Sequence, residues 1–189
     1  MKNKLGLYIH IPFCEKKCRY CGFLSFDDLD DHKKNDYIDA LCYEIRLCGK
    51  EYAGSYIVDT VFIGGGTPSF ASAEQIRKIT EIIYKSFDIT EDAEITIESN
   101  PNSLSVEKLR EYRSSGINRL SIGVQSMDDD ILACLGRIHK KDDVLLAYEN
   151  AGKIGFENIN FDLMFGVPDQ TLKQWENTVS EVIKLAPEH

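Results

Sequence analysis

Short apolar runs alternate with helical patterns along the whole chain, and this alternation limits the fold more than any other feature. The apolar runs, which predict strands, are 5–11, 58–66, 93–100, 117–126 and 158–168. The helical patterns that follow them are 33–52, 72–87, 105–116, 128–136, 140–155 and 172–186. Continuous apolar strands joined by helices are typical of a parallel sheet covered by helices. The sequence therefore predicts an α/β fold, with a parallel sheet and outer helices.

The repeat stops after five βα units, where the residues LAPEH occupy the place at which another strand is due. Because a parallel sheet that ended there would leave an unpaired edge, we expect a partial (βα)6-type barrel, truncated after the fifth unit. No linker or low-complexity tract divides 1–189, which predicts one incomplete core domain. Ser72 and Ser105 are the expected N-caps of two helices, and Gly116 is the expected terminator of the second.

Composition narrows the functional classes. The formal net charge is -9 and the isoelectric point is about 5.0, which argues against binding a nucleic-acid backbone, because neutralising phosphates needs a basic face. No apolar run approaches the length of a membrane span, and the start of the chain lacks an export signal. We therefore expect a cytoplasmic protein, in which clustered cysteines indicate a metal site rather than disulfides.

Cys14, Cys18 and Cys21 lie within eight positions, directly after the first predicted strand. Zinc prefers four protein ligands, and no second pair of cysteines follows. His10 could be a fourth ligand, or equally a half-buried residue of the strand. An iron–sulfur cube held by three cysteines instead leaves one iron open, and the spacing favours it over zinc. The other cysteines sit in helical patterns, where we expect plain apolar packing: Cys42, Cys48 and Cys134.

The second predicted strand ends in three glycines, 64–66, followed by Thr67. Glycines let a backbone approach a ligand closely, so their N–H groups could bind a carboxylate, although a tight strand-to-helix turn explains them equally well. The segment is not a P-loop, because no GK[ST] follows. Tyr8 and Tyr20 are as compatible with core positions as with ligand contacts.

Polar residues also follow the later strands. Glu98 and Asp162 are either ligand-binding acids or caps and ion-pair partners. Gln125 is either a ligand contact or a buried hydrogen-bonding residue. Arg137 is either a ligand contact or an exposed cation at a helix end. In parallel α/β folds, sites form where the strands end. The convergence of these residues on that edge is stronger support for a site than any single motif.

Taken together, these motifs resemble the radical S-adenosylmethionine superfamily, within it the branch of oxygen-independent coproporphyrinogen III dehydrogenases and related haem chaperones. The matching stretches are LYIHIPFCEKKCRYC, FIGGGTPS, ESNP, RLSIGVQS, LGRIHKKDD and NINFDLMFGVPDQT, in the family's order over nearly the whole chain. The resemblance implies a radical SAM barrel in which Cys14, Cys18 and Cys21 hold a [4Fe-4S] cluster. The open iron of that cluster is chelated by S-adenosylmethionine, which an electron then cleaves to methionine and a 5′-deoxyadenosyl radical.

The resemblance also implies which residues contact S-adenosylmethionine: Tyr8, Tyr20, Gly65, Gly66, Thr67, Glu98, Gln125, Arg137 and Asp162. The chemistry of these side chains agrees with that assignment. Arg137 suits a carboxylate, Glu98 and Asp162 suit hydroxyls or an ammonium, and Tyr20 suits adenine. A reduced flavodoxin or ferredoxin-type protein is the implied electron donor.

Two departures separate the chain from the dehydrogenases. Their cysteine run continues Cys-x-x-Cys-x-Cys, whereas Gly22 and Phe23 follow Cys21 here, and their N-terminal arm has no counterpart before Tyr8. Both features resemble the haem chaperones, whose carboxy-terminal domain we expect to lie outside residues 1–189. We therefore expect a protein of haem delivery or porphyrin metabolism. The alternatives are a true coproporphyrinogen III dehydrogenase, which would make the protein an oxidoreductase, and a zinc-stabilised α/β binding module without redox chemistry.

Overall fold

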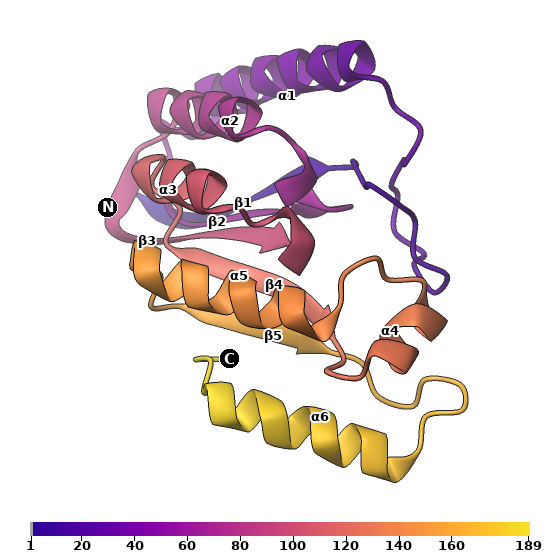
Figure 1. Cartoon of the computed structure of the whole chain (residues 1–189). Coiled ribbons are helices and arrows are strands. Elements are labelled where there is room, and N and C mark those ends of the chain that lie inside the picture. The colour runs from indigo at the N-terminus through magenta and orange to yellow at the C-terminus, as the bar shows by residue number, and fades with distance from the viewer. Residues whose placement is uncertain (1) are drawn as a thin grey trace.

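The computed structural model describes residues 2–189 and shows a five-stranded parallel sheet (Figure 1). The strands are β1 (Asn3–Ile11), β2 (Tyr56–Gly65), β3 (Ile89–Ser99), β4 (Arg119–Gln125) and β5 (Ile159–Leu163). They lie in the sheet in sequence order, and every neighbouring pair is parallel. This arrangement confirms the predicted α/β fold, with the first three strands starting earlier than the apolar runs indicated.

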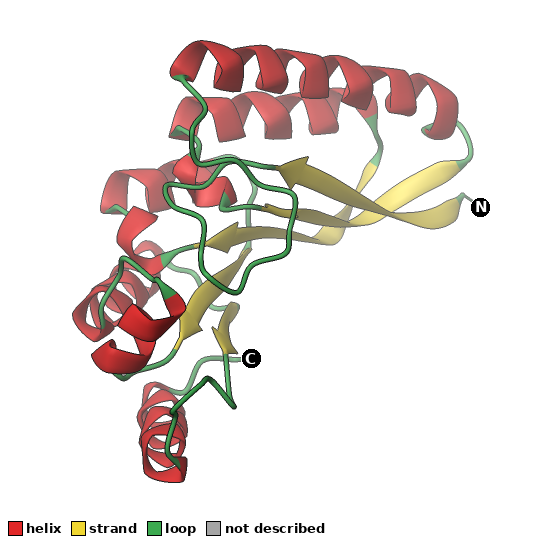
Figure 2. Cartoon of the chain, turned by 90° about the vertical axis from the view of Figure 1, so that its right-hand side faces the viewer, coloured by secondary structure: helices red, strands yellow, loops and turns green. Residues whose placement is uncertain are grey.

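Helices connect the strands and cover one side of the sheet (Figure 2). They are α1 (Asp31–Tyr52), α2 (Ala73–Ser86), α3 (Val106–Ser114), α4 (Asp129–Leu135), α5 (Lys141–Ile154) and α6 (Leu172–Leu185), and two single turns are η1 (Pro68–Phe70) and η2 (Pro101–Ser103). Figure 2 looks onto the ends of the strands, and the loop between β1 and α1 crosses in front of them.

The strands alternate between an apolar face toward the helices and a polar face on the other side. Ile63, Ile97 and Ile122 have no exposed surface and belong to the hydrophobic core under the helices. Tyr8, by contrast, is 60% exposed on the opposite face. Because successive side chains of a strand point to opposite faces, only the helix-covered face is fully buried. The polar face is therefore free to line a site.

The predicted helix caps are confirmed. Ser72 Oγ accepts from the Gln75 N–H at 3.1 Å, and Gln75 returns a bond to the Ser72 N–H at 2.9 Å, which completes a capping box. Ser105 Oγ accepts from the Lys108 N–H at 3.2 Å. Gly116 follows α3 with a φ of 88°, a conformation in which glycine avoids the strain of a side chain.

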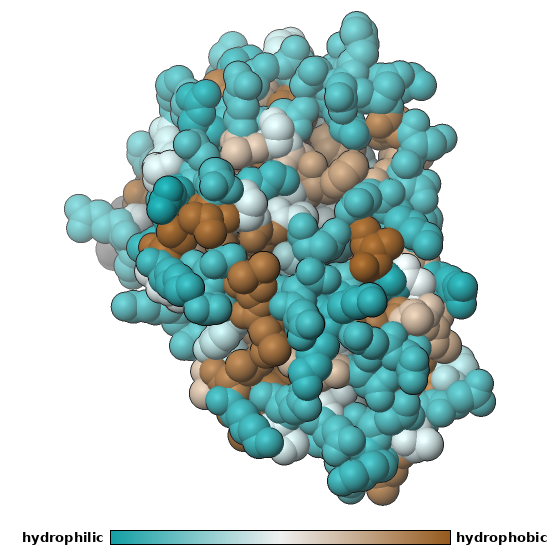
Figure 3. All heavy atoms as spheres, viewed as in Figure 1, coloured by the Kyte–Doolittle hydropathy of each residue, from teal (hydrophilic) through white to brown (hydrophobic). Residues whose placement is uncertain are grey.

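The end of the chain lies against the open edge of β5. The Phe161 N–H donates to the His189 carbonyl at 2.9 Å, and the His189 N–H donates to the Ile159 carbonyl at 3.2 Å. These bonds place His189 where a sixth strand of the sheet would pair. Among residues 2–189, no helix is both long enough and apolar enough to cross a membrane. Seen from the side of Figure 1, the surface is mostly hydrophilic, with apolar side chains gathered in patches (Figure 3).

Candidate cofactor site at the ends of the strands

A cavity of about 380 Å³ opens where the strands end, beneath the loop that follows β1. Its walls contain every residue predicted from the sequence except Tyr8. These are Cys14, Cys18, Cys21, Tyr20, Gly65, Gly66, Thr67, Glu98, Gln125, Arg137 and Asp162. Further lining residues include Lys17, Ser99, Asn100, Ser121, Gly123 and Met164. The edge of the sheet thus gathers residues that lie up to about 150 positions apart in the sequence.

The cysteine loop is closed by backbone bonds between its two ends. The Cys14 N–H donates to the Phe26 carbonyl at 2.9 Å, and the Phe26 N–H donates to the Pro12 carbonyl at 2.8 Å. Within the loop, the Cys21 N–H donates to the Cys18 carbonyl at 3.2 Å, which turns both thiols toward the same space. Cys14 is buried, whereas Cys18 and Cys21 are half-buried. The loop therefore presents three thiols on one wall of the cavity.

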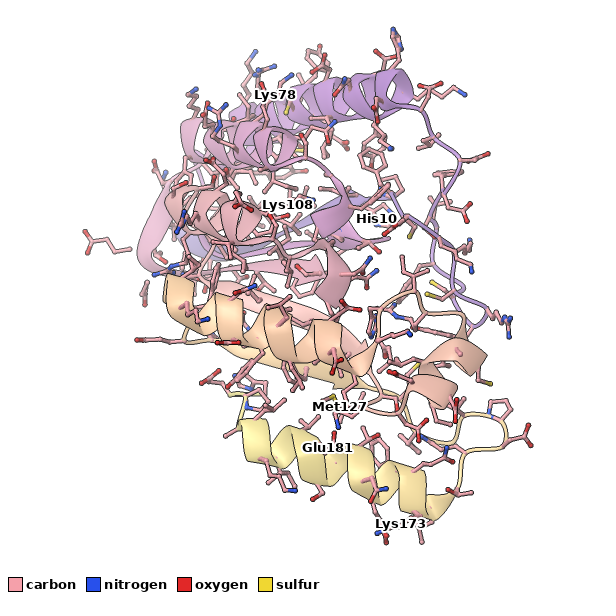
Figure 4. All side chains as sticks on the ribbon, in the orientation of Figure 1. His10, Lys78, Lys108, Met127, Lys173 and Glu181 are labelled. Atoms are coloured by element: carbon pink, nitrogen blue, oxygen red, sulfur yellow. The ribbon has the colours of Figure 1, made fainter. Side chains whose placement is uncertain are left out.

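His10 anchors this loop and has no nitrogen left for a metal. Its Nδ1 lies 3.0 Å from the Tyr8 hydroxyl, and its Nε2 lies 3.1 Å from the Leu24 carbonyl. Figure 4 shows His10 at the end of β1, beside the loop. Because a metal ligand needs a free ring nitrogen, the structure favours an anchoring role over the fourth-ligand alternative. Tyr8 contributes to this anchor and lies outside the cavity.

The thiols fit an iron–sulfur cube better than a single ion. Among residues 2–189, no group of three His, Cys, Asp or Glu side chains is arranged to hold one metal ion. A single zinc would require its thiolates to converge at about 2.3 Å from one point. A cube instead binds each thiolate through a different iron, which suits thiols spread along one cavity wall. The zinc-stabilised alternative therefore has no support in the geometry.

The N–H groups of the glycine loop are already used by the protein. The Gly65 N–H donates to Glu98 Oε2 at 2.9 Å, the Gly66 N–H to the Ile11 carbonyl at 2.9 Å, and the Thr67 N–H to the Phe13 carbonyl at 2.7 Å. Of the two alternatives for the glycines, the hydrogen bonds favour a tight turn held within the protein over free N–H groups that bind a carboxylate. They join the loop to β1, to the start of the cysteine loop and to β3.

Glycine is required at 66 because the backbone packs closely there. A Cβ on Gly66 would lie 2.7 Å from the Phe13 carbonyl oxygen and 3.0 Å from Cys14 Sγ. Both distances are shorter than ordinary van der Waals contacts of a side chain. The missing side chain lets the glycine loop pack directly against a thiol of the cavity.

The acidic residues lie on the polar face of β3 and β5, two strands that β4 separates. Burial raises the pKa of Glu98, and the hydrogen bond from Gly65 partly offsets this shift. Asp162 accepts from Asn160 Nδ2 at 2.7 Å and from Ser121 Oγ at 3.3 Å. Neither carboxylate caps a helix or forms an ion pair within residues 2–189. Both therefore offer oxygen atoms to the cavity.

Gln125 and Tyr20 border the same space. Gln125 ends β4 with a φ of 66°, which is rare for a residue with a side chain and concentrates at functional sites. Tyr20 is 43% exposed, and partial burial raises the pKa of its hydroxyl. An aromatic ring at the cavity mouth could stack on a planar ligand.

Arg137 is half-buried in the cavity wall instead of projecting from a helix end. Its Nη2 donates to Asn100 Oδ1 at 2.5 Å and to the Gly123 carbonyl at 2.7 Å. Its Nη1 lies 3.5 Å from Cys18 Sγ, and its Nε lies 3.3 Å from His139 Nδ1. This arrangement puts a fixed positive charge beside the thiols, where it can bind an anion or stabilise thiolates.

Ser121, Gly123 and His139 were not among the residues predicted from the sequence, and Asn100 appeared there only within the ESNP motif. Gly123 and Ser121 lie within the apolar run of β4, and the period-2 alternation of that strand would have placed both on the polar face. His139 follows closely after Arg137, but no sequence pattern showed that the two side chains touch.

The remaining cysteines lie outside the cavity. Cys42 is buried in the core and Cys48 packs against it, as predicted. Cys134 on α4 is exposed, so the expectation of plain apolar packing is wrong for this cysteine. The short helix α4 turns Cys134 outward and buries Ile131 and Leu135 instead.

Comparisons with known proteins agree with this site. A protein-family profile described as the radical SAM superfamily matches residues 8–182. The chain is 44% identical over 184 residues to the haem chaperone HemW of Bacillus subtilis, covering 96% of this chain and 48% of that protein. It is 35% identical over 187 residues to the oxygen-independent coproporphyrinogen III oxidase of Escherichia coli, covering 99% and 41%.

Among solved structures, coproporphyrinogen III oxidase (HemN) from Escherichia coli superimposes with a TM-score of 0.91 at 34% identity, covering 98% of this chain and 43% of that one. The chain thus spans about half the length of the curated relatives that it matches. The profile covers most of the chain and the three thiols line the cavity. The chain therefore belongs to the radical SAM superfamily, whose cofactors are a [4Fe-4S] cluster and S-adenosylmethionine.

Proposed function

We propose that residues 1–189 form the radical SAM core domain of a haem chaperone of the HemW type, acting in haem delivery in the cytoplasm. The observation that carries the proposal is the end of the cysteine loop. Gly22 and Phe23 follow Cys21, and Phe23 is 69% exposed at the rim of the cavity, where the dehydrogenases are expected to carry another cysteine. The higher identity to HemW than to the coproporphyrinogen oxidase supports the same choice.

The cavity residues suit the two cofactors. We assign Cys14, Cys18 and Cys21 as cluster ligands, because they are the only cysteines of the described chain that line the cavity. The cluster would supply the electron that cleaves the sulfonium of S-adenosylmethionine. Arg137 would bind the carboxylate of that cofactor. The N–H groups of the glycine loop are already hydrogen-bonded within the protein, so a side chain would have to make this contact.

The other predicted residues divide by their place. Glu98 and Asp162 would accept hydrogen bonds from the ammonium or hydroxyl groups of S-adenosylmethionine, Tyr20 would contact adenine, and Gln125 would border the ligand. Gly65, Gly66 and Thr67 would form the wall against which the methionine end packs. Tyr8 would act through His10 and the loop, since it lies outside the cavity.

The relatives are about twice as long as this chain. Haem would therefore bind to the full-length protein, with a further domain contributing to its site. A reduced flavodoxin or ferredoxin-type protein would supply the electron from outside. The remaining cysteines of the described chain lie apart, on α1 and α4, and offer no second cluster site.

A second candidate is oxygen-independent coproporphyrinogen III dehydrogenase, which the TM-score of 0.91 to the Escherichia coli oxidase favours. The test uses the full-length product of the gene, anaerobically reconstituted with iron and sulfide. Haem titration and coproporphyrinogen turnover are measured on the same preparation. Stoichiometric haem binding without formation of vinyl groups would support the chaperone proposal, and conversion of the two propionates to vinyls would overturn it. The Cys18→Ala protein, which lacks a cluster ligand, controls for turnover that needs no cluster.

A further inference from the structure

His139 is a buried imidazole to which none of the cofactor roles above has been assigned. It follows α4, exposes 2% of its surface and does not line the cavity. Its Nε2 lies 3.0 Å from the Val124 carbonyl oxygen. Because a carbonyl oxygen only accepts hydrogen bonds, Nε2 carries the proton and Nδ1 is an acceptor in the neutral ring. The contact with Val124 therefore selects the tautomer.

The acceptor Nδ1 faces the guanidinium of Arg137. Arg137 Nε donates to it at 3.3 Å, while Nη2 donates to Asn100 and to the Gly123 carbonyl. A guanidinium has five N–H groups in one rigid plane, so bonds on two of its nitrogens orient the third. Nη1 is the nitrogen that remains, and it lies beside Cys18 Sγ at the cavity.

We propose that His139 is a positioning residue, which holds Arg137 Nε so that Nη1 faces the cavity and binds the carboxylate of S-adenosylmethionine. This inference goes beyond the haem-chaperone proposal. It rests on the proposed role of Arg137 toward S-adenosylmethionine and not on the choice between chaperone and dehydrogenase, so it would survive if the protein proved to be a dehydrogenase.

The surroundings keep the imidazole neutral, as this role requires. Burial lowers the pKa of His139 to about 4, and the positive charge of Arg137 lowers it as well. The hydrogen bond to Val124 and the charges of Asp143 and Asp129, on the helices at either side, act in the opposite direction. A protonated ring would turn Nδ1 into a donor facing Arg137 Nε, and the hydrogen bond would be lost.

Two amide substitutions of His139 test the two hydrogen bonds of its ring one at a time. In His139→Asn, Oδ1 can take the place of Nδ1 and accept from Arg137 Nε. In His139→Gln, Nε2 can take the place of the ring Nε2 and donate to Val124, but the acceptor for Arg137 is lost. A role in packing alone would make both variants similar, whereas positioning through Arg137 makes them different.

The experiment measures the dissociation constant of S-adenosylmethionine by calorimetry on full-length protein reconstituted with its cluster. We expect about tenfold weaker binding in His139→Gln and a change of less than about threefold in His139→Asn. In an Arg137→Gln background, His139→Gln should weaken binding no further, because the residue through which it acts is gone. Equal losses in both amides, or an undiminished loss in the Arg137→Gln background, would overturn the proposal.

A second measurement needs no cluster, so a variant that loads iron poorly still decides the question. The ¹⁵N–H signal of Arg137 Nε in the metal-free protein should exchange slowly with solvent in the wild type and in His139→Asn. It should exchange rapidly in His139→Gln. Slow exchange in all three proteins would show that Arg137 is held without His139, which contradicts the inference.

Discussion

The main-chain N–H of Gly65 donates to the carboxylate of Glu98 across 2.9 Å, from β2 to β3. With the bonds from Gly66 to Ile11 and from Thr67 to Phe13, it ties the glycine loop to the strand or loop on each side. The loop is therefore a rigid joint between the sheet and the cysteine loop. Its glycines serve close packing within the protein as much as the approach of a ligand.

Replacing Glu98 by Ala should leave the Gly65 N–H without its acceptor in a half-buried place. We expect the free energy of unfolding to fall by about 1–3 kcal/mol, the usual cost of an unsatisfied buried donor. Glu98→Gln keeps an oxygen at this position and should cost less than about 1 kcal/mol. Urea unfolding of the metal-free protein measures both, and equal stability of the Ala and Gln variants would contradict the argument.

Gly66→Ala should impair cluster binding. The new methyl group would meet the Phe13 carbonyl and Cys14 Sγ at 2.7 and 3.0 Å, so the start of the cysteine loop must move. We expect iron and acid-labile sulfide per chain to fall after anaerobic reconstitution. Gly152→Ala is the matched control, because nothing lies within 4 Å of a Cβ there. Full cluster content in Gly66→Ala would show that the loop accommodates the methyl group.

Removing one of the three cavity cysteines should affect the cluster, whereas removing the exposed Cys134 should not. Replacing Cys14, Cys18 or Cys21 by Ala should abolish the brown colour and the reduced [4Fe-4S] EPR signal, since each is proposed to bind a different iron. Far-UV circular dichroism should stay unchanged, because the sheet and its core do not depend on these side chains. Cys134→Ala should keep the cluster, and loss of the signal in that variant would show that the ligands are misassigned.

Stability should fall as the pH drops from about 6.5 to about 4, with a contribution from His139. Its pKa is lowered from 6.5 in the free side chain to about 4 in the fold, so between these values the unfolded chain takes up a proton that the folded chain does not. The contribution is present above pH 6.5 and is lost toward pH 4, with a size on the order of 3 kcal/mol.

His139→Gln removes this titration while keeping a polar side chain in place. Chemical unfolding at a series of pH values should therefore give a shallower slope for the variant between pH 6.5 and 4. Parallel slopes would mean that His139 titrates near its ordinary value in the folded protein.

Tyr112→Phe should stabilise the fold slightly or leave it unchanged. Tyr112 is completely buried on α3, and its hydroxyl has no hydrogen-bond partner among residues 2–189. Removing a buried hydroxyl that lacks a partner takes away its desolvation cost of about 1–3 kcal/mol, while the ring still packs in the core. Thermal unfolding tests this, and a clear loss of stability would indicate a partner such as a buried water molecule.

Four features of the fold could be predicted from the sequence: the alternation of strands and helices, the parallel sheet, the caps at Ser72 and Ser105, and the cysteine loop. Each depends on local signals: the period of apolar residues, a side chain near its own backbone, or spacing within a few positions. The rule that parallel strands end at one edge also predicted that these residues lie together, and all of them except Tyr8 line the same cavity.

Only the tertiary structure decided three features. These are the hydrogen bonds of the glycine N–H groups, the outward turn of Cys134, and the contacts that run from Val124 through His139 to Arg137. These features depend on the register between strands and on how α4 is turned against the sheet, to within a few tenths of an ångström. Periodicity in a sequence specifies which face of an element is buried, but it does not specify which atoms on two separate elements meet. By itself the sequence therefore determined the fold and many of the residues that line the cavity, while packing between elements determined the hydrogen bonds that orient them.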